Sequence, residues 1–129
     1  MEPILKSMIL SVSMFVIGAT ASAAPKATPE LLTKGKTSYA TNCAMCHGDK
    51  GDADSPAGQA MIPKPRNFLT MKFVNGDKPE QIFDSITKGL PGTTMMAYGH
   101  IPEEDRWGLS YYIKSLQKAG KGSTKKAGK

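Results

Sequence analysis

The sequence predicts a small all-α domain in which three main helices are joined by long loops. Three segments carry helix-start signals followed by apolar residues at helical spacing, and no segment shows the convincing alternation of a strand. With 129 residues, the chain is long enough for one ordinary domain and too short for two with full cores. Loops this long in so small a domain indicate that a non-protein group fills the middle.

Residues 1–23 are typical of a secretory signal peptide. Lys6 supplies a positive charge, residues 8–18 form a short apolar stretch, and Ala-Ser-Ala at 21–23 is a small-residue cleavage pattern. We therefore expect cleavage before Ala24 and a periplasmic or otherwise exported protein. The alternative is an uncleaved membrane anchor, but the segment is short for a membrane span and lacks a basic flank.

The first main helix is expected to begin after Thr28, a capping hydroxyl, with Pro29 at the first helical position. Its buried face is read from residues that share one side of a helix. These residues are Leu32, Gly35, Tyr39 and Cys43. Glycine and proline then mark residues 48–67 as a loop.

The second main helix is expected after a capping box at residues 77–80 and is expected to stop at Gly89. Its buried stripe is expected to be Ile82, Phe83 and Ile86.

The third main helix opens at Pro102 with three acidic residues, which suit the positive end of the helix dipole. Its stripe is Leu109, Tyr112, Ile113 and Leu116. We expect it to end near Gln117, so that the domain covers residues 24–117 and a flexible Lys/Gly-rich tail covers residues 118–129.

The positive charge is concentrated at the end of the chain. Lys and Arg number 17 against 11 Asp and Glu, a net charge of +6, and five of the lysines lie in residues 118–129. A nucleic-acid-binding domain carries its charge on structured surface, so this distribution argues against nucleic acid as a partner. It favours redox proteins with acidic docking surfaces, or peripheral contact with an anionic membrane. A tail that only solubilises a monomer is the other interpretation.

Residues 43–47 carry the motif that indicates chemistry. Cys43, Cys46 and His47 form C-x-x-C-H, the attachment pattern of c-type haem. Two thiols at this spacing reach the two vinyl groups of one haem and form thioethers, and the adjacent histidine becomes an axial ligand of the iron. The sequence therefore predicts one covalently bound haem c.

Three other interpretations of the cysteines are weaker. A thioredoxin-like C-x-x-C needs a βαβ context, and none is visible. A zinc site needs four ligands, whereas the mature chain offers two cysteines, His47 and the distant His100. A plain disulfide leaves the adjacent histidine unexplained. The secretory signal favours haem, because haem c is attached outside the cytoplasm.

A second axial ligand is sought among the five methionines of the mature chain. Met95 and Met96 lie in the loop at residues 92–99, which can cross the haem face opposite His47. The alternatives are that both methionines only pack on the haem edge or that His100 is the sixth ligand. Arg66 follows a Pro-x-Pro loop and is the candidate to bind a haem propionate.

With these residues in place, the chain resembles a small class I c-type cytochrome over residues 28–117. Besides the C-x-x-C-H motif near the mature N-terminus, Gly35, Tyr39 and Cys43 match the family's Gly-x-x-x-aromatic-x-x-x-Cys helix. Leu109 and Tyr112 match the last-helix residues that cross it. The resemblance implies that Gly35 is needed because two helix backbones approach closely there.

The resemblance also implies roles for two loop residues. Ser55-Pro56 stands where the family has Gly-Pro, so the Pro56 carbonyl would accept the His47 Nδ1 proton. Gly92-Thr93-x-Met95 matches the distal loop, which makes Met95 the sixth ligand. The family usually has proline after this methionine, and Met96 stands there instead. The choice between Met95 and Met96 therefore stays open.

The function expected from these residues is single-electron transfer by a carrier that is not an enzyme. Five side chains are expected to shield the haem from water and so raise its potential. They are Met61, Ile82, Phe83, Ile86 and Trp107. The alternatives are a haem subunit of a larger oxidoreductase, or a haem sensor or peroxidase-like protein with a labile distal methionine.

Overall fold

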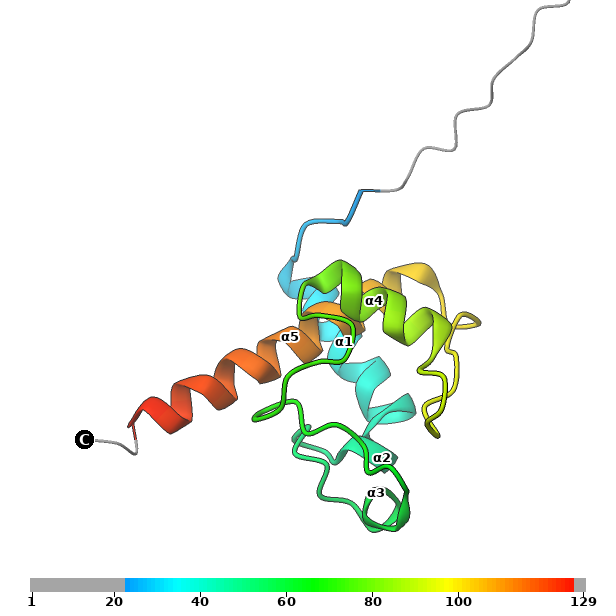
Figure 1. Cartoon of the computed structure of the whole chain (residues 1–129). Helices are drawn as coiled ribbons and strands as arrows, with labels where there is room; N and C mark the ends of the chain where they lie inside the picture. Colours follow the sequence, from blue (N-terminus) through cyan, green and yellow to red (C-terminus); the bar gives the residue numbers. More distant parts are fainter. Residues whose placement is uncertain (1–22, 127–129) are drawn as a thin grey trace, which may run out of the picture.

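A computed structural model describes residues 23–126 of the chain, with side chains up to residue 122. The described residues form five helices and no strand, which confirms the all-α prediction (Figure 1). In chain order the helices are α1 (Pro29–Asn42), α2 (Ala44–His47), α3 (Pro56–Ala60), α4 (Pro79–Lys88) and α5 (Glu103–Lys126). The proposed signal sequence, apart from residue 23, lies outside the described residues. No helix between residues 23 and 126 combines the length and apolar content needed to cross a membrane.

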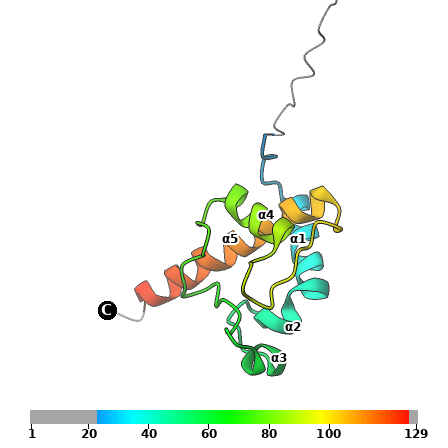
Figure 2. The same ribbon diagram turned by 45° about the vertical axis from the view of Figure 1, so that its right-hand side comes forward.

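Helices α1 and α5 cross at a pair of glycines, and both ribbon views show the crossing (Figures 1 and 2). A Cβ added to Gly35 would lie 2.0 Å from the Gly108 carbonyl oxygen, and one added to Gly108 would lie 2.6 Å from the Leu31 carbonyl oxygen. Any larger residue would push the two backbones apart. The close approach expected at Gly35 is present, and Gly108 is its unanticipated partner.

Helix α1 begins as predicted. Pro29 is its first residue, and the Thr28 hydroxyl accepts a hydrogen bond from the Leu31 N–H at 3.2 Å. The buried face differs from the prediction, because Leu31 and Ser38 are buried whereas Leu32 and Cys43 are only half-buried.

Helix α4 starts one residue later than the predicted capping box. Lys78 is the N-cap, and its N–H donates to the Gln81 side chain at 3.1 Å. Asp77 instead forms an ion pair with Lys114 of α5 at 2.9 Å. The predicted stop is confirmed, since Gly89 ends the helix with φ of 72°, a conformation that favours glycine.

Helix α5 is longer than predicted. It continues past Gln117, which is 97% buried by the rest of the fold, and runs to Lys126. The backbone of α5 at Gly120 lies directly on the backbone of Leu69, where a Cβ would lie 2.3 Å from the Leu69 carbonyl oxygen. The prediction of a flexible tail starting at residue 118 is therefore wrong for residues 118–126. The last turns project beyond the body of the protein (Figures 1 and 2).

A single core joins four of the helices and two loops. It is built mainly from aromatic and branched side chains of α1, α4, α5 and the loops before α4 and α5, and α2 contributes Ala44. Its buried members are Tyr39, Ala44, Phe68, Ile82, Ile86, Ile101, Leu109 and Ile113. Several of them also face the cavity described next, so the core and the cavity share a wall.

Candidate functional site

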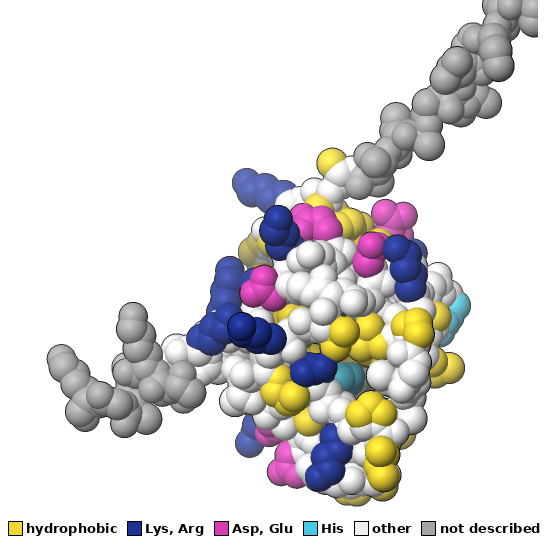
Figure 3. Space-filling view, in the orientation of Figure 1, with side chains coloured by type: hydrophobic (Ala, Val, Ile, Leu, Met, Phe, Trp, Pro, Cys, Tyr) yellow, Lys and Arg dark blue, Asp and Glu magenta, His cyan; other side chains and the backbone are white. Residues whose placement is uncertain are grey.

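One cavity opens between α4, the loop before it and the segment that carries the two cysteines. Its empty space, including the open mouth, is about 1090 Å³. The lining is largely apolar, and Figure 3 shows apolar side chains gathered on the middle of this face, below α4. A large, flat, apolar group suits such a space.

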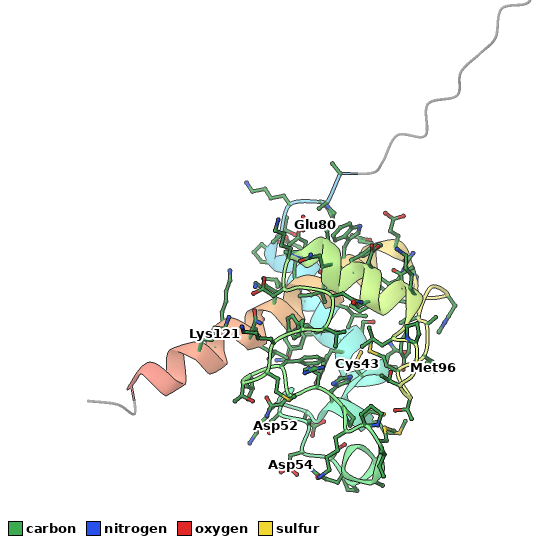
Figure 4. All side chains as sticks on the ribbon, in the orientation of Figure 1. Cys43, Asp52, Asp54, Glu80, Met96 and Lys121 are labelled. Atoms are coloured by element: carbon green, nitrogen blue, oxygen red, sulfur yellow. The ribbon has the colours of Figure 1, made fainter. Side chains whose placement is uncertain are left out.

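The two cysteines and the histidine reach this cavity from a single turn of chain. Cys43 ends α1, where its N–H donates to the Tyr39 carbonyl at 2.9 Å. The next turn, α2, carries Cys46 and His47, and the His47 N–H donates to the Cys43 carbonyl at 2.9 Å. All three side chains line the cavity, and Figure 4 shows Cys43 inside the body of the fold.

His47 is held in one orientation. Its Nδ1 lies 3.0 Å from the Arg66 carbonyl oxygen, and because a carbonyl only accepts, Nδ1 must carry the proton and Nε2 keeps its lone pair. Burial lowers the pKa of His47, although the bond to Arg66 opposes this. The neutral imidazole is the form that binds iron.

The Phe68 ring covers the imidazole of His47. The two ring centroids are 4.4 Å apart and the planes are inclined by 18°. Phe68 is itself buried and packs edge-on against Tyr39 and Phe73. A wall of three aromatic residues therefore prevents the histidine from rotating.

Pro56 does not have the role that the resemblance implied. The acceptor of the His47 Nδ1 proton is the Arg66 carbonyl, and Pro56 is an exposed residue at the start of α3. Its neighbour Ser55 caps this helix and donates its hydroxyl to the Cys46 carbonyl at 3.0 Å. Pro56 is the first residue of α3, and the carbonyl that contacts His47 belongs to Arg66, ten residues later.

Burial keeps the Cys43 sulfur neutral. Desolvation, with a smaller contribution from Cys46, raises the pKa of Cys43 to about 12. Both cysteines are free thiols. A thioether is also neutral, so attaching a group through Cys43 adds no charge to the apolar cavity.

The loop between α4 and α5 brings Met95 into the lining of the same cavity. Met95 lines the cavity, whereas Met96 is 63% exposed and lies at the edge of the fold (Figure 4). The loop is closed by its own hydrogen bonds. Thr93 accepts from the Met95 N–H at 3.1 Å and donates to the Leu90 carbonyl at 2.7 Å. The Leu90 N–H donates to the Met95 carbonyl at 3.1 Å.

The remaining candidates divide into two groups. Arg66, Met61, Ile82 and Ile86 line the cavity. Phe83 and Trp107, which were expected to shield the haem, lie outside the lining. They stack on each other with centroids 4.1 Å apart, where the side chains of α4 and α5 meet.

The alternative interpretations of the cysteines find little support in this geometry. The described residues contain no strand, so they offer no βαβ unit for a thioredoxin-like site. Within the same part of the chain, no three His, Cys, Asp or Glu side chains gather to hold a metal ion. The donor set fits haem c instead, since it combines two thiols, a neutral imidazole and a facing thioether around one apolar cavity.

Sequence reasoning missed three residues of the site. The sequence analysis does not link Phe68 to His47, names Ser55 only as the neighbour of Pro56, and considers the side chain of Arg66 instead of its backbone. A signal existed for the first, because Phe68 is the one aromatic residue in the loop between α3 and Thr70. Nothing in the sequence points to the Arg66 carbonyl, since every residue has one.

Comparison with known proteins agrees with the geometry. The family model described as cytochrome c matches residues 32–117. No curated protein matches the chain. Among solved structures, a chain of the reducing HAO-like protein complex of Kuenenia stuttgartiensis is similar, with 33% identity and a TM-score of 0.64. The match covers 78% of this chain and 47% of that one, so the present chain corresponds to about half of its relative.

Proposed function

The chain belongs to the cytochrome c family, whose domains perform haem-based electron transfer, and from this premise we propose that it is a single-electron carrier with one haem c. Cys43 and Cys46 would hold the haem covalently, and His47 and Met95 would bind its iron. The observation that carries the proposal is that an oriented, neutral His47 and the Met95 side chain line the same cavity.

The bound haem supplies a centre that accepts and releases one electron. The residues of the chain adjust how readily this happens. A thioether from Met95 is a soft ligand that favours the reduced state, and the bond from His47 Nδ1–H to Arg66 makes the imidazole a stronger donor. Apolar contacts from Ile82 and Ile86 keep water away and disfavour the extra charge of the oxidised state. No proton or atom is transferred.

Export is part of the proposal. Residues 1–23 act as a secretory signal, and haem is attached after the chain has left the cytoplasm. The carrier then works in the periplasm.

The basic end of α5 is proposed to guide acidic redox partners, or to contact an anionic membrane surface. Lys and Arg side chains gather where α5 leaves the body (Figure 3). Such a patch raises association rates by steering, and the effect weakens as salt screens the charges.

A second candidate function is a fixed haem subunit of a larger oxidoreductase. The observation that favours it is the similarity to a chain of the Kuenenia stuttgartiensis protein complex. A sensor or peroxidase-like role requires Met95 to leave the iron. It is favoured only by the fact that the backbone of Met95 is held by a hydrogen bond from within its own loop.

One spectroscopic experiment separates these functions. The protein is exported from a host that attaches haem c, and its mass is measured to establish a single porphyrin. A carrier shows a ferric methionine–iron charge-transfer band that added CO or cyanide leaves unchanged on short timescales. A high-spin haem, or one that binds these ligands rapidly, contradicts the carrier and supports the sensor or peroxidase-like role. Co-purification of the native protein in a stable complex supports the subunit.

The steering proposal has its own test. All five lysines of residues 118–129 are changed to glutamine, which keeps the length of the chain. Reduction by the co-purified donor is then measured at low and high salt. We expect slower reduction at low salt only, and an unchanged rate contradicts steering.

A further inference from the structure

The C-terminal part of α5 has a sequence that does not favour a helix. Residues 118–126 contain Gly120 and Gly122 and no large apolar side chain, and glycine is the poorest helix former after proline. The helix nevertheless continues to Lys126. In proteins, most helix stability comes from packing rather than from intrinsic propensity, so a tertiary contact must support this segment.

The two glycines differ in their surroundings. A Cβ on Gly120 would lie 2.3 Å from the Leu69 carbonyl oxygen and 2.6 Å from the Leu69 Cα. A Cβ on Gly122 would meet nothing within 4 Å. Gly120 is therefore required where the helix lies on the loop backbone, and Gly122 is not.

The residue that Gly120 contacts, Leu69, is next to the residue that packs on His47. Leu69 follows Phe68, whose ring is stacked on His47 at 4.4 Å. The Phe68 N–H donates to the Gly51 carbonyl at 2.7 Å.

A second contact from α5 supports the same segment. About one turn before Gly120, Leu116 packs on Gly51, with its Cδ1 2.8 Å from where a Cβ of Gly51 would lie. Helix α5 thus contacts Leu69 through Gly120, and it contacts Gly51, whose carbonyl accepts from the Phe68 N–H, through Leu116.

We propose that Gly120 is a positioning residue for His47. By letting α5 lie on the backbone of Leu69, it keeps the Phe68 ring against the imidazole and so fixes the orientation of the proximal ligand. Gly120 acts only through Phe68 and does not touch the haem. This inference rests on the proposed function, in which His47 is an axial ligand.

The test compares Gly120→Ala with Gly122→Ala in the full-length, haem-loaded protein. Amide hydrogen exchange is followed at the Phe68 N–H, and the Cys43 N–H of α1 reports global unfolding. Because overpacking destabilises the contact, we expect Gly120→Ala to speed Phe68 exchange about tenfold, which corresponds to about 1.4 kcal/mol. Gly122→Ala should leave it unchanged. Equal Phe68 exchange in the two variants overturns the proposal.

A second readout separates positioning from simple destabilisation. The reduction potential and the paramagnetically shifted proton signals of the His47 ring are measured in both variants. We expect them to change in Gly120→Ala and to match the unaltered protein in Gly122→Ala. Faster exchange without any change in these signals overturns the proposal, because the contact is then only structural. Absence of shifted His47 signals in the unaltered protein instead contradicts the proposed function.

The unaltered protein provides a measurement that needs no variant. Native-state exchange is followed in increasing denaturant below the unfolding transition. We expect the amides of residues 119–122 and the Phe68 N–H to open together, with the same denaturant dependence. If residues 119–122 open fully while Phe68 keeps its protection, the proposal is overturned.

Discussion

The two sides of the cavity are held by different kinds of contact. His47 is fixed by residues far from it in the chain, namely the Arg66 carbonyl at 3.0 Å and the Phe68 ring at 4.4 Å. Met95 is fixed mostly by its own loop, through hydrogen bonds among Leu90, Thr93 and Met95. Two side chains also tie the loop to the rest of the fold, since the Thr94 hydroxyl donates to the Met61 sulfur at 3.3 Å and the Tyr98 hydroxyl donates to the Asn42 carbonyl at 3.2 Å.

This difference predicts which side of the cavity opens first. Opening the histidine side requires breaking the contacts of the buried Phe68, whereas opening the methionine side requires the loss of a few exposed hydrogen bonds and of the half-buried packing of Met95 against the core. Regions with few buried contacts open at low free-energy cost. We therefore expect release of Met95, and not of His47, to be the first structural change under mild stress.

The largest expected effect is on the histidine side. Phe68→Ala removes a buried ring and should lower the free energy of unfolding by about 3–5 kcal/mol. It should also shift the His47 ring signals. The matched control is Phe83→Ala, whose ring stacks on Trp107 outside the cavity lining. Denaturant unfolding should show a smaller loss for this half-buried residue, with unchanged haem spectra. Equal spectral changes in both variants contradict the special role of Phe68.

Met95→Ala should affect only the other side. The ferric methionine–iron band should disappear and CO should bind. The haem should stay attached on the His47 side. For a half-buried methionine we expect about 2 kcal/mol of destabilisation, the lower end for such truncations. Met96→Ala, the control, should keep the band and change stability by no more than about 0.5 kcal/mol. If Met96→Ala loses the band instead, Met96 is the ligand.

Thr93→Val should loosen the loop without removing its methionine. It deletes the hydroxyl that links Leu90 and Met95, which contributes about 1 kcal/mol, or a factor of about five. Stopped-flow mixing with imidazole should show displacement of Met95 faster by about that factor. Thr93→Ser keeps the hydroxyl and should restore the slower rate. An equally fast Thr93→Ser indicates that the methyl group, and not the hydrogen bonds, holds the loop.

The smallest expected effect concerns an ion pair remote from both ligands. The hydrogen bond and charge of Lys114 lower the pKa of Asp77 below its ordinary value. Because the pKa of Asp77 is lower in the folded protein than in the unfolded chain, the ion pair stabilises the folded protein at pH values above the unfolded-state pKa. This stabilisation is lost as the pH falls through the folded-state pKa. Lys114→Gln should therefore lower the denaturant midpoint slightly at neutral pH and leave it unchanged once Asp77 is protonated. A difference that persists at acid pH assigns the effect to Lys114 packing.

Much of the fold was predictable because its signals are local. Thr28 and Pro29 start α1, Gly89 ends α4, and acidic residues open α5. Each signal depends on backbone hydrogen bonds within a few residues, so the sequence alone is sufficient. The end of α5 was mispredicted because Gly120 looks like a helix breaker until Leu69 is known to lie against it.

The candidate site shows the same division. Spacing within residues 43–47 already places two sulfurs and one imidazole on a single turn, since no distant contact is needed to do so. The family resemblance was misleading for Pro56, because the acceptor of the His47 proton comes from Arg66, nineteen residues along the chain. The resemblance favoured Met95 as the ligand but left Met96 as an alternative.

The sequence by itself determined the all-α class, the starts of the helices and the turn that bears Cys43, Cys46 and His47. Only the tertiary structure decided which carbonyl orients the histidine, which of the two adjacent methionines faces the cavity and how far α5 runs. The physical reason is the range of the interactions involved. Caps and short motifs act over one or two turns of chain, whereas the orientation of His47 and the length of α5 depend on backbone from a distant part of the sequence. The choice between the methionines depends on how their loop packs against the cavity.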